Sequence, residues 1–419
     1  MTDTMKWVSA ISTRPSLEAA IADVVEQAQG RLQDTADLAI VFISSAFTSE
    51  FSRLMPLLQE KLSVPALIGC SGGGVIGVDP AAQVQEIEGA AALSLTLAKL
   101  PGVKVQAFHI GSDDLPDLDS PPDRWVELFQ VDPQDHPQFI LLADPVSAGV
   151  NSVLQGLDYA YPDAVKIGGL ASVGNVAPHS SLFWNYQLVR EGVVGVALSG
   201  NVVLEAIVAQ GCRPIGQPYR VVEAERNILM QLEEQADADV VPVERFASAR
   251  TVSRTPLDVL QALFQDLSEA DRVLAQHSLF VGIVSDEFKL RPEQGDFLVR
   301  NLLGVDPKTG AIAVGDRIRP GQRIQFHLRD AETSGDDLEL LLARHHRQME
   351  SEAIGALLFS CLGRGEGLYG QPNYDSKLFD RYFTKVPVSG FFCNGEIGPV
   401  GNTTFLHGYT SVFGIVRQA

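Results

Sequence analysis

The chain of 419 residues is 45% hydrophobic, 20% charged and 7% aromatic, and its 52 acidic and 32 basic side chains give a formal net charge of −20. This composition is typical of a folded chain with two or three domains and gives no indication of disorder. Nucleic-acid phosphates and anionic lipids repel so acidic a chain, and the nearest basic cluster, Arg344 to Arg347, lies in a predicted helix beside acidic residues. We therefore expect neither nucleic-acid binding nor membrane insertion.

The N-terminal segment and the cysteines both indicate a cytoplasmic protein. The segment MTDTMKWVSAISTRPSLEAA has no basic stretch followed by an apolar one, and no part of the chain approaches the roughly 18 apolar residues that span a bilayer. The four cysteines are widely separated and form no CxxC pair. We therefore expect reduced thiols, and neither a disulfide framework nor a zinc site.

The first half of the chain contains the same order of elements twice. The predicted strands of the first copy are 38–44, 64–77, 89–98 and 103–111, and those of the second are 138–144, 164–176 and two within 192–211. Turns at Leu100-Pro101-Gly102 and Ser199-Gly200-Asn201 predict that the last two strands of each copy form a hairpin. We expect an internal duplication, at about 36–111 and 138–211, of two α/β units in one sheet system.

The second half has a different pattern. Residues 226–276 are acidic with a helical period, which predicts a helical connector between domains. Predicted strands and two predicted helices, at 335–350 and 374–383, follow beyond residue 277. The expected fold class is therefore α/β and α+β, with a duplicated α/β sheet unit at 1–225 and a β-rich α+β domain at 277–419.

Several motifs resemble the FIST family, a family of sensory domains found in bacteria and eukaryotes. Residues 355–365 (GALLFSCLGRG), 390–401 (GFFCNGEIGPVG) and 298–316 (LVRNLLGVDPKTGAIAVGD) are similar to its C-terminal half. Residues 68–77 (IGCSGGGVIG) and 179–200 (HSSLFWNYQLVREGVVGVALSG) resemble its N-terminal half. The resemblance covers the chain from about 35 to 415.

The resemblance implies a module that binds small molecules such as amino acids. In that family, eukaryotic members carry an F-box, and some bacterial members are reported to bind haem and sense nitric oxide. Nothing in this sequence suggests a kinase, a diguanylate cyclase or an F-box. If the protein signals, it is expected to do so through a separate partner protein that the sequence does not identify.

Two apolar strand candidates, 356–361 and 388–393, each end at a cysteine followed by a glycine-containing turn and a charged residue. If these strands are neighbours in register, Arg364 offers a planar fork for a carboxylate, Glu396 accepts an ammonium group and Asn394 both donates and accepts. An amino-acid zwitterion needs such a set; the alternative is that Arg364 and Glu396 simply pair with each other. Ligands bind beyond the carboxyl ends of strands in open α/β sheets, so a pocket bordered by the two glycine turns, near 70–74 and 168–175, is a further candidate site; the alternative is that the first turn is a tight turn that needs positive φ. The predicted ligand-binding residues are Cys361, Gly363, Arg364, Gly365, Cys393, Asn394, Gly395, Glu396, Ser71 and Gly72.

Two alternatives come from other chemistry. A haem-based nitric oxide sensor needs an axial ligand and a large apolar pocket, and the strand-borne candidates are His109 and His327. A cysteine-dependent enzyme or redox switch would use Cys361 or Cys393, with His407 as the base nearest in sequence. Because the sequence has no serine-nucleophile, zinc-protease or paired-carboxylate signature, we predict a binding protein that is not an enzyme and has no resident cofactor.

Overall fold

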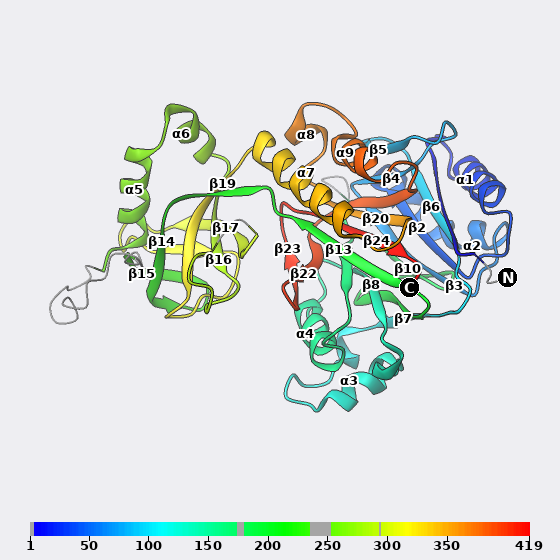
Figure 1. The fold of residues 1–419 in the computed structure, drawn as a ribbon, viewed down its shortest axis with the longest axis horizontal. Coiled ribbons are helices and arrows are strands. Elements are labelled where there is room, and N and C mark those ends of the chain that lie inside the picture. Colours follow the sequence, from blue (N-terminus) through cyan, green and yellow to red (C-terminus); the bar gives the residue numbers. More distant parts are fainter. Residues whose placement is uncertain (1–3, 174–179, 235–252, 293–294) are drawn as a thin grey trace. The chain divides into compact units, whose positions relative to one another are not determined.

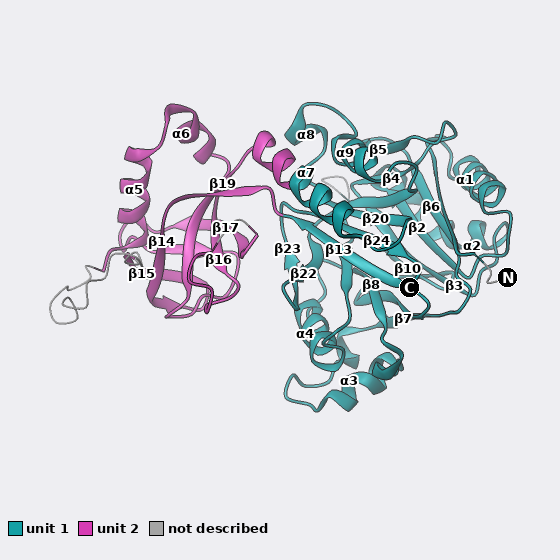
Figure 2. Ribbon diagram, viewed as in Figure 1, with its two compact units in different colours: residues 1–209, 338–419 teal, residues 210–337 magenta. Residues whose placement is uncertain are grey.

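A computed structural model describes residues 4–173, 180–234, 253–292 and 295–419 (Figure 1). The chain divides into two compact units, one of residues 1–209 with 338–419 and one of residues 210–337, which are coloured separately in Figure 2. No helix within the described ranges is long and apolar enough to cross a membrane. The α/β and α+β class is confirmed, because helices alternate with mixed sheets in the first unit and strands form a barrel in the second.

The first unit contains three six-stranded sheets with one common design. The first sheet has the order β1 (Lys6–Ser12), β6 (Leu93–Lys99), β2 (Leu38–Ser44), β3 (Ala66–Gly72), β10 (Leu182–Trp184) and β11 (Gln187–Val189). The second has the order β7 (Val103–Ile110), β12 (Val193–Gly200), β8 (Gln138–Ala143), β9 (Lys166–Leu170), β22 (Glu396–Val400) and β23 (Thr403–His407). The third has the order β13 (Val203–Ala209), β24 (Ser411–Arg417), β20 (Ala353–Cys361), β21 (Val388–Cys393), β4 (Gly74–Val78) and β5 (Val84–Glu88).

The three sheets are built by three repeats that exchange strands. In each sheet the two central strands, β2–β3, β8–β9 or β20–β21, are parallel, and the other pairs are antiparallel. The first four strands of each sheet come from one repeat, and the last two come from another. The first repeat gives β4 and β5 to the third sheet, the second gives β10 and β11 to the first, and the third gives β22 and β23 to the second. The expected copies, 36–111 and 138–211, overlap the first two of these repeats but have different bounds, because the first copy leaves out β1 and includes β7 of the second repeat.

Helices cover one face of each sheet, and the other faces pack on one another. The helices are α1 (Leu17–Leu32) and α2 (Phe51–Gln59) on the first sheet, α3 (Pro122–Phe129) and α4 (Val150–Ala160) on the second, and α7 (Ala331–Gln348) and α9 (Tyr374–Tyr382), with the short α8 (Glu366–Tyr369), by the third. A separate core joins the inner faces of all three sheets, and in it Phe42 of β2 stacks on Phe391 of β21 at 5.0 Å. Short 3-10 turns lie at Ser45–Glu50, Ser112–Asp114 and Pro133–Asp135.

A glycine marks the same point in each parallel pair. Gly69, Gly168 and Gly390 lie opposite Val41, Leu141 and Leu358 of the neighbouring strand. A side-chain carbon added at these glycines would lie only 2.2, 1.8 and 1.8 Å from the carbonyl oxygens of those partners. Only glycine permits this approach of the two backbones. Each of the three repeats therefore has a glycine at the equivalent position of its second parallel strand.

The second unit is a closed barrel with two helices. Its strands follow the order β14 (Cys212–Glu225), β15 (Ile228–Glu234), β18 (Ile312–Val314), β17 (Phe297–Val305), β16 (Leu279–Val284) and β19 (Arg323–Arg329), and its helices are α5 (Pro256–Asp266) and α6 (Glu269–Ala275). In chain order the barrel is an insertion between β13 and α7 of the third repeat.

Three expectations from the sequence need correction. The predicted hairpins are wrong, because β6 and β7 belong to different sheets, as do β12 and β13, so each tight turn carries the chain from one sheet to the next. The helical connector is wrong over 228–234, which form β15 on the barrel, whereas α5 and α6 are helical as predicted. The expected division at 225 and 277 follows chain order, whereas the first unit is completed by residues 338–419.

Candidate functional site

The carboxyl ends of the parallel strands β20 and β21 form one edge of the third sheet. The register pairs Cys361 with Cys393, as the sequence predicted for neighbouring strands. Beyond this pair, the Leu362 N–H donates to the carbonyl of Cys393 at 3.0 Å, so the two turns continue side by side. We call this place, with the side chains that pack on it, the third-sheet edge.

Only some of the predicted residues reach the surface at this edge. Gly363 and Asn394 are exposed and Cys361 is partly exposed, whereas Cys393, Gly395 and Glu396 are buried. The Cys361 sulfur accepts the Tyr409 N–H at 3.2 Å. Burial, together with the nearby Glu396 carboxylate, holds the pKa of the Cys393 thiol well above its ordinary value. The two thiols therefore differ in environment although they are partners in the register.

Arg364 is fully buried and bound to Asp375 of α9. Its Nε and Nη2 donate to the two carboxylate oxygens at 2.9 and 3.0 Å, and Nη2 also donates to the Tyr369 hydroxyl. The Ser411 hydroxyl donates to the same carboxylate at 2.5 Å. Burial alone would raise the pKa of Asp375, but the guanidinium beside it lowers that pKa below its usual range. One nitrogen of Arg364, Nη1, is buried and has no hydrogen-bond partner among the described residues.

Arg364 and Glu396 bind different partners, and their convergence on one ligand stays a prediction. Arg364 is committed to Asp375, and Ser360, which faces the helices, also contacts that carboxylate. Glu396 starts β22 in the second sheet, where its Oε2 accepts the Thr410 N–H at 3.1 Å. The sequence did not indicate the partner of Arg364, because that partner, Asp375, lies on a helix that follows later in the chain.

Ser71 and Gly72 do lie beside the ends of the other repeats. The Ser71 carbonyl accepts the Ser172 N–H at 3.0 Å, and the Gly73 N–H donates to the Ser172 hydroxyl at 2.7 Å. A side chain on Gly72 would lie 2.9 Å from the Cβ of Phe391 in β21. These buried contacts hold three turns together, and a role for Ser71, Gly72 or Gly395 in ligand binding stays a prediction.

Four residues of this region were missed by sequence reasoning: Asp375, Tyr369, Glu86 and Glu88. Glu86 of β5 is 5% exposed, and its Oε1 accepts the Ser376 N–H of α9 at 2.7 Å. Burial, reinforced by the neighbouring Asp375 charge, raises the pKa of Glu86 to about 7. Its other oxygen, Oε2, is buried without a hydrogen-bond partner among the described residues. The run VQEIE has three polar residues out of five and no apolar face, so the sequence contains no local signal for this burial.

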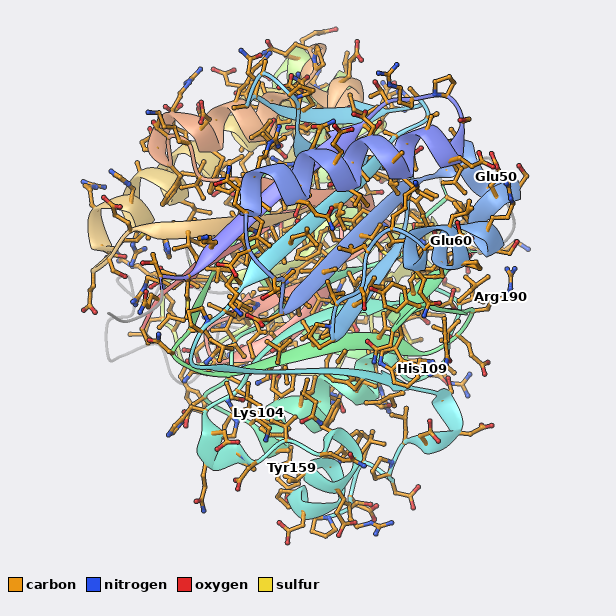
Figure 3. All side chains as sticks on the ribbon, turned by 90° about the vertical axis from the view of Figure 1, so that its right-hand side faces the viewer. Glu50, Glu60, Lys104, His109, Tyr159 and Arg190 are labelled. Atoms are coloured by element: carbon orange, nitrogen blue, oxygen red, sulfur yellow. The ribbon has the colours of Figure 1, made fainter. Side chains whose placement is uncertain are left out.

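The histidines of the alternative hypotheses have ordinary partners. His109 of β7 is partly exposed and its Nε2 lies 3.0 Å from the Glu191 carbonyl (Figure 3). His327 is buried in the barrel, where burial lowers its pKa to about 4, and the Nε2 of His407 lies 3.0 Å from the Gly398 carbonyl. In the part of the chain that the structure describes, no group of three or more His, Cys, Asp and Glu side chains is placed to hold a metal ion.

A cavity of about 720 Å³ lies at the other end of the third sheet. It is lined by the carboxyl ends of α7 and α9 and by the residues that enter β20, including His346, Glu350 and Phe383. None of the predicted ligand-binding residues lines it. At the third-sheet edge, Arg364 is buried between Tyr369 of α8 and Asp375 of α9.

Comparisons with known proteins agree with the resemblance seen in the sequence. The family model of the FIST N domain matches residues 37–235, and that of the FIST C domain matches residues 256–399. An uncharacterized protein of Mycobacterium tuberculosis is 32% identical over 407 residues, which is 96% of this chain and 97% of that protein. An F-box/LRR-repeat protein of Arabidopsis thaliana is 23% identical over 78% of this chain and 67% of its own length. The human F-box only protein 22 is 31% identical over 84 residues, 16% of this chain and 21% of that protein. The chain therefore belongs to the FIST family of sensory domains.

Proposed function

We propose that this protein is a sensory module that binds a small polar metabolite, such as an amino acid, at the third-sheet edge. The observation that carries the proposal is the buried Nη1 of Arg364, a charged donor with no protein partner among the described residues. Leaving a buried donor unsatisfied costs about 1–3 kcal/mol, and more when the group is charged. A ligand carboxylate that accepts from this nitrogen would remove that cost.

Glu86 supplies the opposite charge in the same cluster. Its Oε1 is bound to the Ser376 N–H, next to Asp375, while Oε2 has no partner in the described structure. An ammonium group is the ligand function that a carboxylate oxygen accepts. Arg364 and Glu86 therefore replace the expected pair of Arg364 and Glu396 as the charged groups for a zwitterion.

The exposed residues of the edge are the predicted approach for the ligand. Gly363 and Asn394 are accessible, Cys361 is partly so, and the carboxyl ends of parallel strands are where α/β sheets bind ligands. We propose that binding shifts the balance between conformations and that a separate signalling protein detects this shift. In this proposal the protein binds its ligand without catalysing a reaction. Its cytoplasmic location stays a prediction.

A thermal-shift screen with the twenty amino acids and small carboxylic acids tests the proposal. A compound at a hundredfold its Kd adds about 2.7 kcal/mol to the stability of the folded state. Asn394→Ala should weaken binding, whereas Asn151→Ala, at an exposed position in α4, is the matched control and should not. If no compound raises the melting temperature, or if both variants bind like the wild type, the proposed site is wrong.

A further inference from the structure

The segment that encloses Arg364 is held by a strand from a different repeat. Tyr369 of α8 lies against the guanidinium, with its ring centre 5.5 Å away, and stacks on Tyr374 at 3.7 Å. Asp375 then pairs with the same guanidinium. We call residues 365–376 the lid, because its side chains separate Arg364 from solvent.

Strand β5 of the first repeat binds the lid through three side chains and one backbone N–H. The Glu88 carboxylate accepts the Glu366 N–H at 2.9 Å, and the Glu86 carboxylate accepts the Ser376 N–H at 2.7 Å. The Asn373 side chain joins the same strand, accepting the Glu86 N–H at 2.6 Å and donating to the Gln85 side chain at 3.1 Å. Figure 1 shows β5 beside α9 at the edge of the third sheet.

The two carboxylates act as helix caps supplied from another repeat. Glu366 and Ser376 lie in the first turns of α8 and α9, where backbone N–H groups have no partner within the helix. Neither helix has a capping side chain of its own, since the residues before them, Gly365 and Asn373, make no side-chain hydrogen bond to the N–H groups of the helix that follows. The first N–H groups of the two lid helices therefore depend on β5 for their hydrogen-bond acceptors.

Three residues of the lid have backbone conformations that are typical of turns. Gly365 and Gly370 have φ of +63° and +66°, and Asn373 has φ of +61°, all in the left-handed region. A side-chain carbon on Gly365 would lie 2.3 Å from the Glu88 carboxylate, which would have to move away from the Glu366 N–H. Hinges commonly concentrate in a few such loop positions.

The charges around the lid are unbalanced. Glu86 and Glu88 come from β5, Glu366 and Asp375 come from the lid, and Arg364 pairs with Asp375. Strand β4, which pairs with β5, places the uncharged Ile76 opposite Glu86. Like charges between β5 and α9 weaken their contact, so the closed lid is held by capping bonds against repulsion.

We infer that residues 365–376 are a lid latched by Glu86 and Glu88, and that the latch must open before a ligand reaches Arg364. The inference rests on the proposed function, since that function supplies the ligand for Arg364, but the opening of the lid can be tested without any ligand. It also gives the first repeat a part in controlling a site that lies on the third.

Hydrogen exchange and arginine modification test the latch without a ligand. In Glu86→Ala, the lid amides should exchange about tenfold faster, as expected for the loss of a helix cap, and phenylglyoxal should modify Arg364 faster by a similar factor. Glu86→Gln keeps an acceptor for the Ser376 N–H and should stay closer to the wild type. Glu60→Ala, at the surface at the end of α2 (Figure 3), is the control and should change neither rate.

The readouts separate lid opening from general unfolding. Exchange in β2 must remain at the wild-type level in Glu86→Ala, since that strand lies in the core of the same unit. Wild-type rates for the lid amides or for Arg364 in Glu86→Ala would overturn the inference. If both rates rise and the amino-acid screen still finds no ligand, the latch stands and the proposed function fails.

Discussion

The three repeats end their first parallel strand at equivalent positions, and these positions contain different chemistry. Three residues beyond the partners of Gly69, Gly168 and Gly390, the chain places Ser44, Asp144 and Cys361. In each case the backbone N–H donates to a carbonyl of the neighbouring antiparallel strand or its turn, that of Ala92, Gly192 or Thr410, at 3.0 Å. One backbone arrangement therefore occurs three times.

The side chains at the first two positions are satisfied by neighbouring groups. The Ser44 hydroxyl accepts the Ala92 N–H at 2.9 Å. The Asp144 carboxylate accepts from the hydroxyls of Ser180 and Ser147 at 2.6 and 2.8 Å. The third position differs, since Cys361 is followed by Arg364, which retains a buried nitrogen without a partner in the described structure. The difference teaches that the backbone arrangement is common to the three repeats, whereas the side chains at and after these three described positions differ in charge and in how fully they are satisfied.

Removal of Arg364 should produce the largest effect on this comparison. Arg364→Met leaves Asp375 buried without its counter-charge, and breaking a buried pair in this way costs about 3–5 kcal/mol. The free energy of unfolding in urea measures the loss. The double variant Arg364→Met with Asp375→Leu removes both charges and should recover most of it; a single variant as stable as the wild type would show that the pair is unimportant.

Gly390→Ala tests whether the glycine positions are required by the repeat. The new methyl group would meet the Leu358 carbonyl, and forcing extra volume into a packed strand costs about 1–3 kcal/mol. The control is Gly30→Ala in α1, where a methyl group has nothing within 4 Å and should stabilise the helix by about 0.5–1 kcal/mol. Thermal unfolding should show a lower melting temperature for Gly390→Ala and a higher one for Gly30→Ala. Equal shifts in the two variants would show that the glycine at position 390 is not required.

The stability of the fold should depend on pH through the raised pKa of Glu86. Because its pKa in the folded protein is raised from 4.5 to about 7, this group stabilises the fold fully below pH 4.5 and loses that contribution as the pH rises through 7. The melting temperature of the wild type should therefore fall between pH 5 and pH 8 relative to that of Glu86→Gln. Parallel curves for the two proteins would show that Glu86 titrates normally.

Thiol labelling should give the smallest effect, a difference in rate with little change in stability. Cys361 is partly exposed, whereas Cys70, Cys212 and Cys393 are buried, and burial raises the pKa of Cys70 and Cys393. Native alkylation with iodoacetamide, followed by mass spectrometry, should therefore modify Cys361 first. Modification of Cys393 at the same rate would show that this edge opens more widely than the latch alone requires.

Local patterns predicted most of the elements in this chain. The apolar run at 38–44 is β2, the helical period at 374–383 is α9, and the strands 356–361 and 388–393 are neighbours in register, which was the condition set for the candidate site. These patterns work because strand and helix periods depend on residues close together in the sequence. The turns at Leu100-Pro101-Gly102 and Ser199-Gly200-Asn201 were also predicted, but turn chemistry does not specify which sheet receives the next strand.

The sequence by itself determined the class of fold and the two cysteine-ended strands of the candidate site, because these depend on local composition and spacing, and its motifs were enough to show the resemblance to the family. Only the tertiary structure decided that there are three repeats that exchange strands, and that Arg364 pairs with Asp375 while Glu86 and Glu88 cap α8 and α9. The physical reason is that a buried charge takes its partner from whatever element packs against it. For the lid, that element is β5, whose Glu88 lies 278 positions before Glu366 in the chain.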